Sequence, residues 1–332
     1  MIKEVLRLMK NQNIHQIYWS FLDRLFKLIF SLTIITYLAK NIGPSDYGIY
    51  SISLSVAIIG GTIIGLGLDQ LSTKLFLNDN NNLLQNLASI FIIKYIVSIF
   101  FTLISLLVLS LFIKDLIFKN QLSIVVLTFL FIPFNTFDPF FRSTYKVKYL
   151  FISSFLRYII MSLIIVYLIY NKQKIEAFLY TIILDQIILS LFYLFFFLKY
   201  EKFQFSKMKF KISDSNKILK PGLLLLLSSF LGYLILRSDQ FFIKFYLGNN
   251  QLGIYSAAVN IYEMFLVLPS IILTGLFPYF VTIENNKKLL FKRFQRICSL
   301  NIVYVLFIVM FWLLLGNIIV NFLFGIHYAL SP

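Results

Sequence analysis

Long runs of apolar residues alternate with short polar segments along this 332-residue chain. A run of about 18 or more apolar residues can cross a bilayer as a single helix. The short alternating segments of a membrane β-barrel do not occur in the sequence. The pattern therefore predicts an all-α integral membrane protein with nine spans, at residues 17–39, 48–68, 87–112, 121–140, 149–170, 175–198, 221–246, 253–276 and 297–315.

Two of the polar interruptions share a sequence. Gly43–Ser51 reads GPSDYGIYS, and Gly248–Ser256, 205 residues later, reads GNNQLGIYS. Each follows an apolar run and opens another, and glycine is the residue that bends most easily. We therefore predict that both segments are tight turns between consecutive spans, and that the chain contains two related halves.

The repeat sets the expected domains. Residues 1–198 are predicted to form an N-terminal six-helix bundle, 199–220 a basic cytoplasmic linker, and 221–332 a partial C-terminal bundle of three spans. Residue 332 corresponds to residue 127 of the first half, so we expect two homologous bundles of which the second is incomplete. The incompleteness leaves open a truncated, inactive fragment, or a partner that supplies the missing helices.

Composition and charge agree with a membrane location. The chain is 59% hydrophobic with a mean hydropathy of +0.85, and its one cysteine, Cys298, cannot form an internal disulfide. If the N-terminus is cytoplasmic, 19 Lys and Arg lie in inside segments and only 5 in outside segments. The positive-inside rule then predicts a cytoplasmic N-terminus. The formal charge of +16 follows from this topology, and no motif indicates a nucleic-acid partner.

A family resemblance rests on specific motifs. The G-x-x-x-[YL]-G-I-Y-S turn occurs twice, LILRSDQFFIKFYLG precedes its second copy, and the chain also has the LGL turn at Leu66–Leu68 and FG-x-x-Y at Phe324–Tyr328. This combination resembles the polysaccharide-exporter branch of the multidrug/oligosaccharidyl-lipid/polysaccharide (MOP) superfamily, and within it the Wzx-type flippases for O-antigen or capsule repeat units. The resemblance implies two MATE-like helix bundles around a central cavity, in a bacterial cytoplasmic (inner) membrane.

Six basic residues lie inside predicted spans, where a charge is costly unless it is paired or faces water. The simplest structural expectation is that Lys94 and Arg157 extend their charged ends to the headgroups. For the other four basic residues it is that each forms an ion pair with Asp23 or Asp239. The alternative is a cationic cavity that binds a pyrophosphate through charge-assisted hydrogen bonds. The resemblance implies the same cavity, so the candidate substrate-binding residues are Arg24, Lys27, Lys94, Arg157, Arg237 and Asp239.

Two carboxylates lie near the middle of predicted spans. Asp185 and Glu263 are either paired with a cavity cation or serve as sites that couple transport to a proton or sodium gradient. Neither histidine has neighbouring ligand residues in the sequence, so we expect no metal site, no cofactor and no catalytic residues.

The leading interpretation is a transporter, and not an enzyme, that flips an undecaprenyl-pyrophosphate-linked oligosaccharide by alternating access. Its expected partners are the lipid-linked substrate, the bilayer, a polysaccharide polymerase and chain-length proteins. Three alternatives remain open at this point: a drug/cation antiporter of the same fold, a membrane-bound polysaccharide polymerase or acyltransferase, and an inactive fragment.

Overall fold

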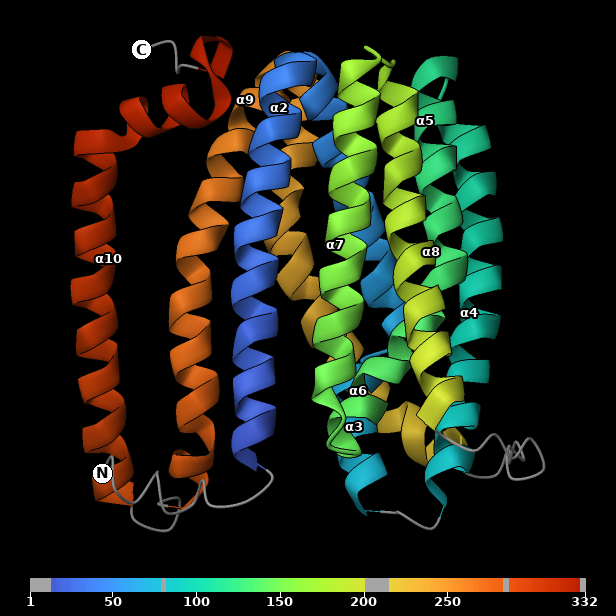
Figure 1. Cartoon of the computed structure of the whole chain (residues 1–332), viewed down its shortest axis with the longest axis vertical. Helices are drawn as coiled ribbons and strands as arrows, with labels where there is room; N and C mark the ends of the chain where they lie inside the picture. The colour runs from blue at the N-terminus through green and yellow to red at the C-terminus, as the bar shows by residue number, and fades with distance from the viewer. Residues whose placement is uncertain (1–12, 79–81, 201–214, 283–286, 329–332) are drawn as a thin grey trace. The chain divides into compact units, whose positions relative to one another are not determined.

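The computed structural model describes residues 13–78, 82–200, 215–282 and 287–328. Within these ranges every element is helical, as Figure 1 shows. The elements are α2 (Asn13–Gly65), α3 (Leu68–Asn78), α4 (Leu83–Phe112), α5 (Leu116–Val126), η2 (Leu127–Thr136), α6 (Phe137–Ser143), α7 (Val147–Tyr170), α8 (Ile175–Tyr200), α9 (Ser215–Thr282), α10 (Lys287–Phe324) and η5 (Ile326–Tyr328).

Two of these helices are interrupted at repeat-equivalent glycines. Gly43 breaks α2 with φ 83° and ψ 165°, and Gly248 breaks α9 with φ 85° and ψ −179°. Residues with a Cβ rarely adopt such φ values, so glycine is the residue suited to both sites. The predicted turns are therefore confirmed, with the same backbone conformation in both copies.

Eight helical segments of the described chain are long and apolar enough to cross a membrane. The sequence predicted nine spans. The difference arises in α9, where Pro221–Glu263 is one continuous apolar segment that includes the break at Gly248. The seventh and eighth predicted spans lie on either side of that glycine, and the side chains of 271–282 are outside the described residues. Most of the predicted linker, at 201–214, is outside the described residues as well.

The chain packs into two compact units with boundaries unlike those of the repeat. Unit 1 contains residues 1–31 and 49–246, and unit 2 contains residues 32–48 and 247–332. The helical segment 221–246, predicted to begin the second bundle, thus packs within unit 1. The predicted division into homologous halves describes the sequence repeat, whereas the two units describe how the chain packs. The division into halves therefore stays a prediction.

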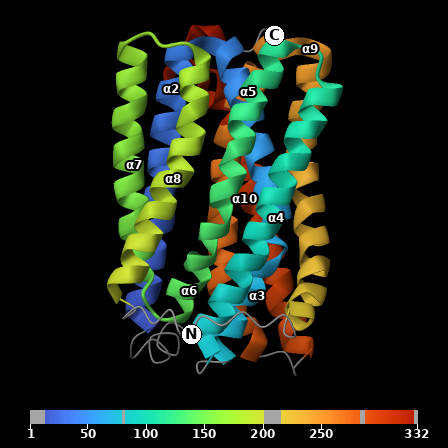
Figure 2. The ribbon, with the colours of Figure 1, turned by 90° about the vertical axis from the view of Figure 1, so that its right-hand side faces the viewer.

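Unit 1 has an aromatic core between α3, α4, α6 and α8. Phe76, Phe140, Phe141 and Phe197 are buried there, and the Phe140 ring meets each of the other three edge to face. Such ring pairs add roughly 0.5–1.5 kcal/mol beyond burial of their area. In Figure 2, α7 and α8 run side by side, in agreement with their packing contacts.

Unit 2 joins the two turn segments to the end of α10. Tyr328 Oη donates to the carbonyl oxygen of Ala39 at 2.8 Å, and its ring packs edge to face against Tyr47. Burial raises the pKa of the Tyr328 phenol, which keeps this donor protonated. The FG-x-x-Y sequence therefore has a structural role, because its tyrosine connects the end of α10 to α2 within unit 2.

Candidate functional site

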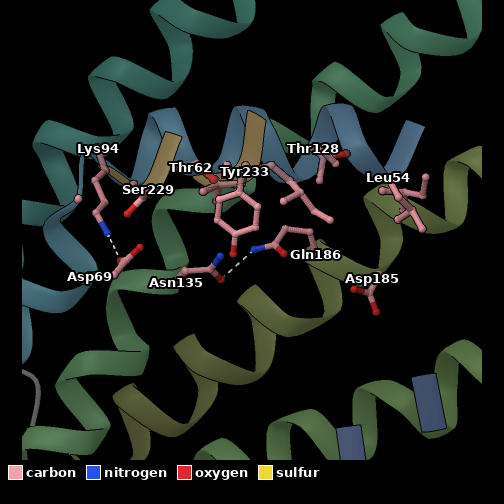
Figure 3. A pocket seen from close by; sticks show the side chains of 17 residues that line it. Leu54, Thr62, Asp69, Lys94, Thr128, Asn135, Asp185, Gln186, Ser229 and Tyr233 are labelled. Carbon is pink, nitrogen blue, oxygen red and sulfur yellow. Dashed lines mark hydrogen bonds and ion pairs between the residues drawn. The ribbon is translucent and has the colours of Figure 1, made fainter. Parts of the chain in front are cut away.

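A polar cavity of about 500 Å³ lies within unit 1. Its walls come from the 54–65 segment of α2, the start of α3, and parts of α4, η2, α8 and α9. Figure 3 shows the side chains of Tyr233, Asn135 and Gln186 pointing toward one another, with the Lys94–Asp69 pair to one side and Asp185 to the other. The polar lining residues are Thr62, Asp69, Lys94, Thr128, Asn135, Asp185, Gln186, Ser229 and Tyr233.

One end of the cavity holds an ion pair between two helices. Lys94 Nζ of α4 lies 2.5 Å from Asp69 Oδ1 in the first turn of α3. The Lys94 side chain is only 1% exposed, whereas that of Asp69 is 56% exposed. The carboxylate at the N-terminus of α3 also interacts favourably with the helix dipole. Lys94 is thus buried and paired, which differs from a side chain that snorkels to the headgroups.

The turn before α3 positions this carboxylate. Leu66 and Gly67 both have positive φ, 53° and 64°. A Cβ at Gly67 would lie within 3 Å of the backbone of Gly222, so only glycine permits this approach. Sequence reasoning identified the LGL turn but missed Asp69, because the residue lies just beyond the predicted span. Its place directly after a glycine turn was the available signal.

A proline distorts the wall formed by η2. Pro133 has no N–H, so it cannot donate to the carbonyl of Phe129, which would be its partner in an α-helix. Ser98 Oγ donates to that carbonyl at 2.6 Å instead. A 3₁₀ stretch inside a longer helical segment often marks a hinge or a functional site.

The η2 wall also orients two amide side chains. Gln186 Nε2 of α8 donates to Asn135 Oδ1 at 2.9 Å, and both residues line the cavity. Thr128 Oγ1, on the same wall, is buried and has no hydrogen-bond partner within the described part of the chain. The sequence analysis missed Gln186 because it is an ordinary polar residue in an apolar run.

At the other end of the cavity, the lining residue Asp185 forms a second ion pair with Arg157, which is not itself part of the lining. Arg157 Nη1 of α7 lies 2.7 Å from Asp185 Oδ2 of α8. The guanidinium carbon of Arg157 is also 4.4 Å from the centre of the Tyr158 ring, a cation–π distance. From the sequence, Arg157 was a candidate for substrate binding, and Asp185 was expected either to pair with a cation or to couple transport to an ion gradient. The structure joins them in one pair.

The remaining candidate residues lie elsewhere. Lys27 Nζ pairs with Asp23 Oδ2 at 2.8 Å, one turn apart on α2. Asp239 accepts a hydrogen bond from the amide of Gln240 at 2.7 Å, and Gln240 contacts Ser55. Of the candidate residues, only Lys94 and Asp185 belong to the described lining of this cavity. The others are Arg24, Lys27, Arg157, Arg237, Asp239 and Glu263.

The charge of the cavity lining differs from the cationic lumen expected. Its described charged residues are one ammonium, Lys94, and two carboxylates, Asp69 and Asp185. The Lys94–Asp69 and Arg157–Asp185 pairs are each neutral as a unit, because burial of an isolated charge is costly and favours a partner of opposite sign. The cavity is therefore polar and hydrogen-bonding, and its lining includes Lys94 and the carboxylates of both ion pairs.

Known proteins resemble this chain at two levels. Residues 14–284 match the family described as polysaccharide biosynthesis protein. A MOP superfamily transporter from Pyrococcus furiosus Vc1, whose binding pocket is described as having reverse polarity, superposes with a TM-score of 0.67 at 16% identity, over 96% of this chain and 75% of its own.

Two further solved structures are MATE family multidrug resistance transporters of the same superfamily. The inward-facing one has a TM-score of 0.67 at 15% identity, over 89% of this chain and 71% of its own. The outward-facing one has a TM-score of 0.63 at 15% identity, over 94% and 73%. No curated protein matches the chain. The predicted MATE-like fold is confirmed, and the chain is a multi-pass membrane protein.

Proposed function

Because the chain belongs to the family of polysaccharide biosynthesis proteins, we propose that it flips a lipid-linked oligosaccharide across the cytoplasmic membrane. Its fold, shared with MOP transporters, supports movement of a substrate by alternating access rather than catalysis. The cargo is an O-antigen or capsule repeat unit on undecaprenyl pyrophosphate. The N-terminus is cytoplasmic, and a polymerase and chain-length proteins act on the product.

The polar cavity of unit 1 is the observation that carries this proposal. Hydroxyl and amide groups are costly to bury in a membrane protein unless they have partners. A sugar presents many hydroxyl groups that both donate and accept hydrogen bonds. Thr128, Gln186 and Ser229 supply complementary groups from three different helical elements, which is how a site recognises the shape of a sugar.

The ion pairs at the ends of the cavity suit an anionic linkage between sugar and lipid. A pyrophosphate oxygen can replace Asp69 at Lys94, because the half-exposed Asp69 side chain can regain water. A phosphate oxygen could likewise replace Asp185 at Arg157. The Arg157 guanidinium would then donate two hydrogen bonds to the phosphate, and the Asp185 carboxylate would be released. Arg24, Lys27, Arg237 and Asp239 are proposed as further contacts, reached by the pyrophosphate during transport.

A complementation experiment tests this function. Cells that lack their own repeat-unit flippase would express this chain, and surface glycan would be measured by labelling intact cells. Gln186→Leu should lower export about tenfold, since one hydrogen bond to substrate contributes about 1.5 kcal/mol. Gln173→Leu, at the exposed connection between α7 and α8, is the matched control and should export normally. Normal export by Gln186→Leu would contradict a sugar-binding role for the cavity.

A drug/cation antiporter is the second candidate. It is favoured by one observation, the two carboxylates against one ammonium in the cavity lining. This function predicts efflux of a fluorescent organic cation that fails in Asp185→Asn, without any effect on surface glycan. Restored glycan together with unchanged cation efflux would exclude it.

A further inference from the structure

A second cavity in unit 1, of about 550 Å³, has a different chemistry from the first. It lies between the 52–60 segment of α2, α4, α5 with η2, and the end of the 221–246 segment of α9. Its lining is apolar except for Ser105 and Lys244. Ile104, Val108 and Phe245 belong to this lining and are exposed, so the cavity is open to the surroundings of the helices, which in a membrane are lipid chains.

We propose that this cavity binds an anionic phospholipid, with one acyl chain in the cavity and the phosphate at Lys244. This inference goes beyond the proposed transport function and does not depend on it. The length of the cavity wall, the position of Lys244 in its lining and the charge around Lys244 support this assignment.

The length of the cavity wall formed by α5 and η2 is close to the thickness of one leaflet. Phe118, near the start of α5, and Phe129, in η2, both line the cavity and are eleven positions apart. At about 1.5 Å per helical residue this spans roughly 16 Å, close to half of a hydrocarbon core about 30 Å thick. The Phe129 ring packs closely against Gly60, another lining residue, where a Cβ would clash with the ring. The slot therefore suits an acyl chain of one leaflet better than a much longer polyprenyl chain.

Lys244 lies at the end of the cavity that is nearest to the lipid headgroups. Lys244 is four residues before the Gly248 break, and its Nζ lies 3.5 Å from the centre of the Phe118 ring. Phe118 follows the short α4–α5 connection, where the helices end and the membrane surface begins. Under the predicted topology this is the outer leaflet. An ammonium at this level attracts an anionic headgroup by about 1 kcal/mol.

The acid nearest to Lys244 in these interactions, Asp115, also has a structural role as the N-cap of α5. Asp115 interacts electrostatically with Lys244. Its Oδ1, however, already accepts hydrogen bonds from the amides of Ile117 and Phe118, at 3.0 and 3.3 Å, where it caps α5. Lys114 and Lys119 lie on either side of Asp115 in the sequence and keep this edge positive. An anionic headgroup is therefore favoured over a zwitterionic one of the same chain length.

Native mass spectrometry of the purified, delipidated full chain tests the proposal. Phosphatidylglycerol and phosphatidylcholine with identical acyl chains would compete for binding. Wild-type protein should prefer phosphatidylglycerol, and Lys244→Gln should weaken its binding about fivefold, the equivalent of roughly 1 kcal/mol. Lys174→Gln removes an exposed lysine from the α7–α8 connection and should bind like wild type. Val108→Trp, which fills the slot, should reduce binding of both lipids.

Three results would overturn the proposal. The first is an unchanged preference for phosphatidylglycerol in Lys244→Gln, and the second is an equal loss in Lys174→Gln. The third is displacement of phosphatidylglycerol by polyprenyl phosphate at equal concentration, which would assign the slot to the substrate carrier. If Lys244→Gln does not fold, Lys244→Arg should keep the preference while Val108→Trp loses binding, and failure of either pattern contradicts the site. Glycan export is measured separately, so the transport proposal is tested independently.

Discussion

At the residue scale, Lys94 and Asp69 form an ion pair in which the lysine side chain is buried and the aspartate side chain is exposed. Lys94→Met leaves a carboxylate that is 56% exposed and hydrated, so the free energy of unfolding should change by less than about 1 kcal/mol. Asp69→Asn instead leaves a buried ammonium without its carboxylate, and should lower the free energy of unfolding by about 3 kcal/mol. Denaturant unfolding in detergent measures both, with Lys74→Met as the exposed control. Equal losses in the two variants would contradict the assigned burial.

A second prediction at this scale concerns Asp185, the carboxylate that lines the cavity. We propose that it couples export to a proton or sodium gradient, in preference to Glu263, which lies in unit 2. Asp185→Asn should abolish the dependence of export on the gradient, as measured by surface glycan after the gradient is collapsed. Glu263→Gln should keep that dependence.

The ion pair with Arg157 requires a separate control, because loss of Asp185 also strands a guanidinium. If the pair is only structural, Arg157→Gln/Asp185→Asn should restore gradient-dependent export. We expect the double variant to remain uncoupled. Full recovery would leave Asp185 with a structural role alone.

At the element scale, the two turn segments of unit 2 meet through reciprocal glycines. A Cβ at Gly48 would lie within 3 Å of the backbone oxygen of Asn249, and one at Gly253 would lie within 3 Å of that of Pro44. These four positions are two pairs related by the repeat distance of 205 residues. Each turn segment therefore contacts the other through the equivalent glycine and the equivalent backbone oxygen. This is expected where two copies of a segment pack about a pseudo-twofold axis.

This packing predicts that small substitutions are costly there. Gly48→Ala and Gly253→Ala should each lower the free energy of unfolding by about 1–3 kcal/mol, because the backbones must separate. Gly232→Ala is the matched control, since no atom lies within 4 Å of its Cβ position in α9. That change should be neutral or stabilising by up to about 1 kcal/mol. Thermal unfolding of the purified variants distinguishes the two cases, and equal stability of all three would contradict the close approach.

At the scale of the whole molecule, the sequence predicts that 199–220 faces the cytoplasm and that 249–252 faces outward. Single cysteines at Lys209 and Asn250, in a Cys298→Ala background, should therefore differ in labelling by an impermeant thiol reagent on intact cells. Only the cysteine at position 250 should react. Labelling at position 209 would reverse the topology, and with it the leaflet assigned to the Lys244 site.

The sequence by itself determined the membrane class, most of the spans and the breaks at Gly43 and Gly248. These features depend on local composition, since apolar length selects a spanning helix and a glycine tolerates positive φ. Only the tertiary structure decided that Lys94 pairs with Asp69 and Arg157 with Asp185, partners 25 and 28 residues apart on different helices. The rotation of each helix about its axis sets which side chains meet. That rotation is set by packing against neighbouring helices. It cannot be predicted from these sequences, because nearly uniform apolar runs have no periodicity that distinguishes one face of the helix from another.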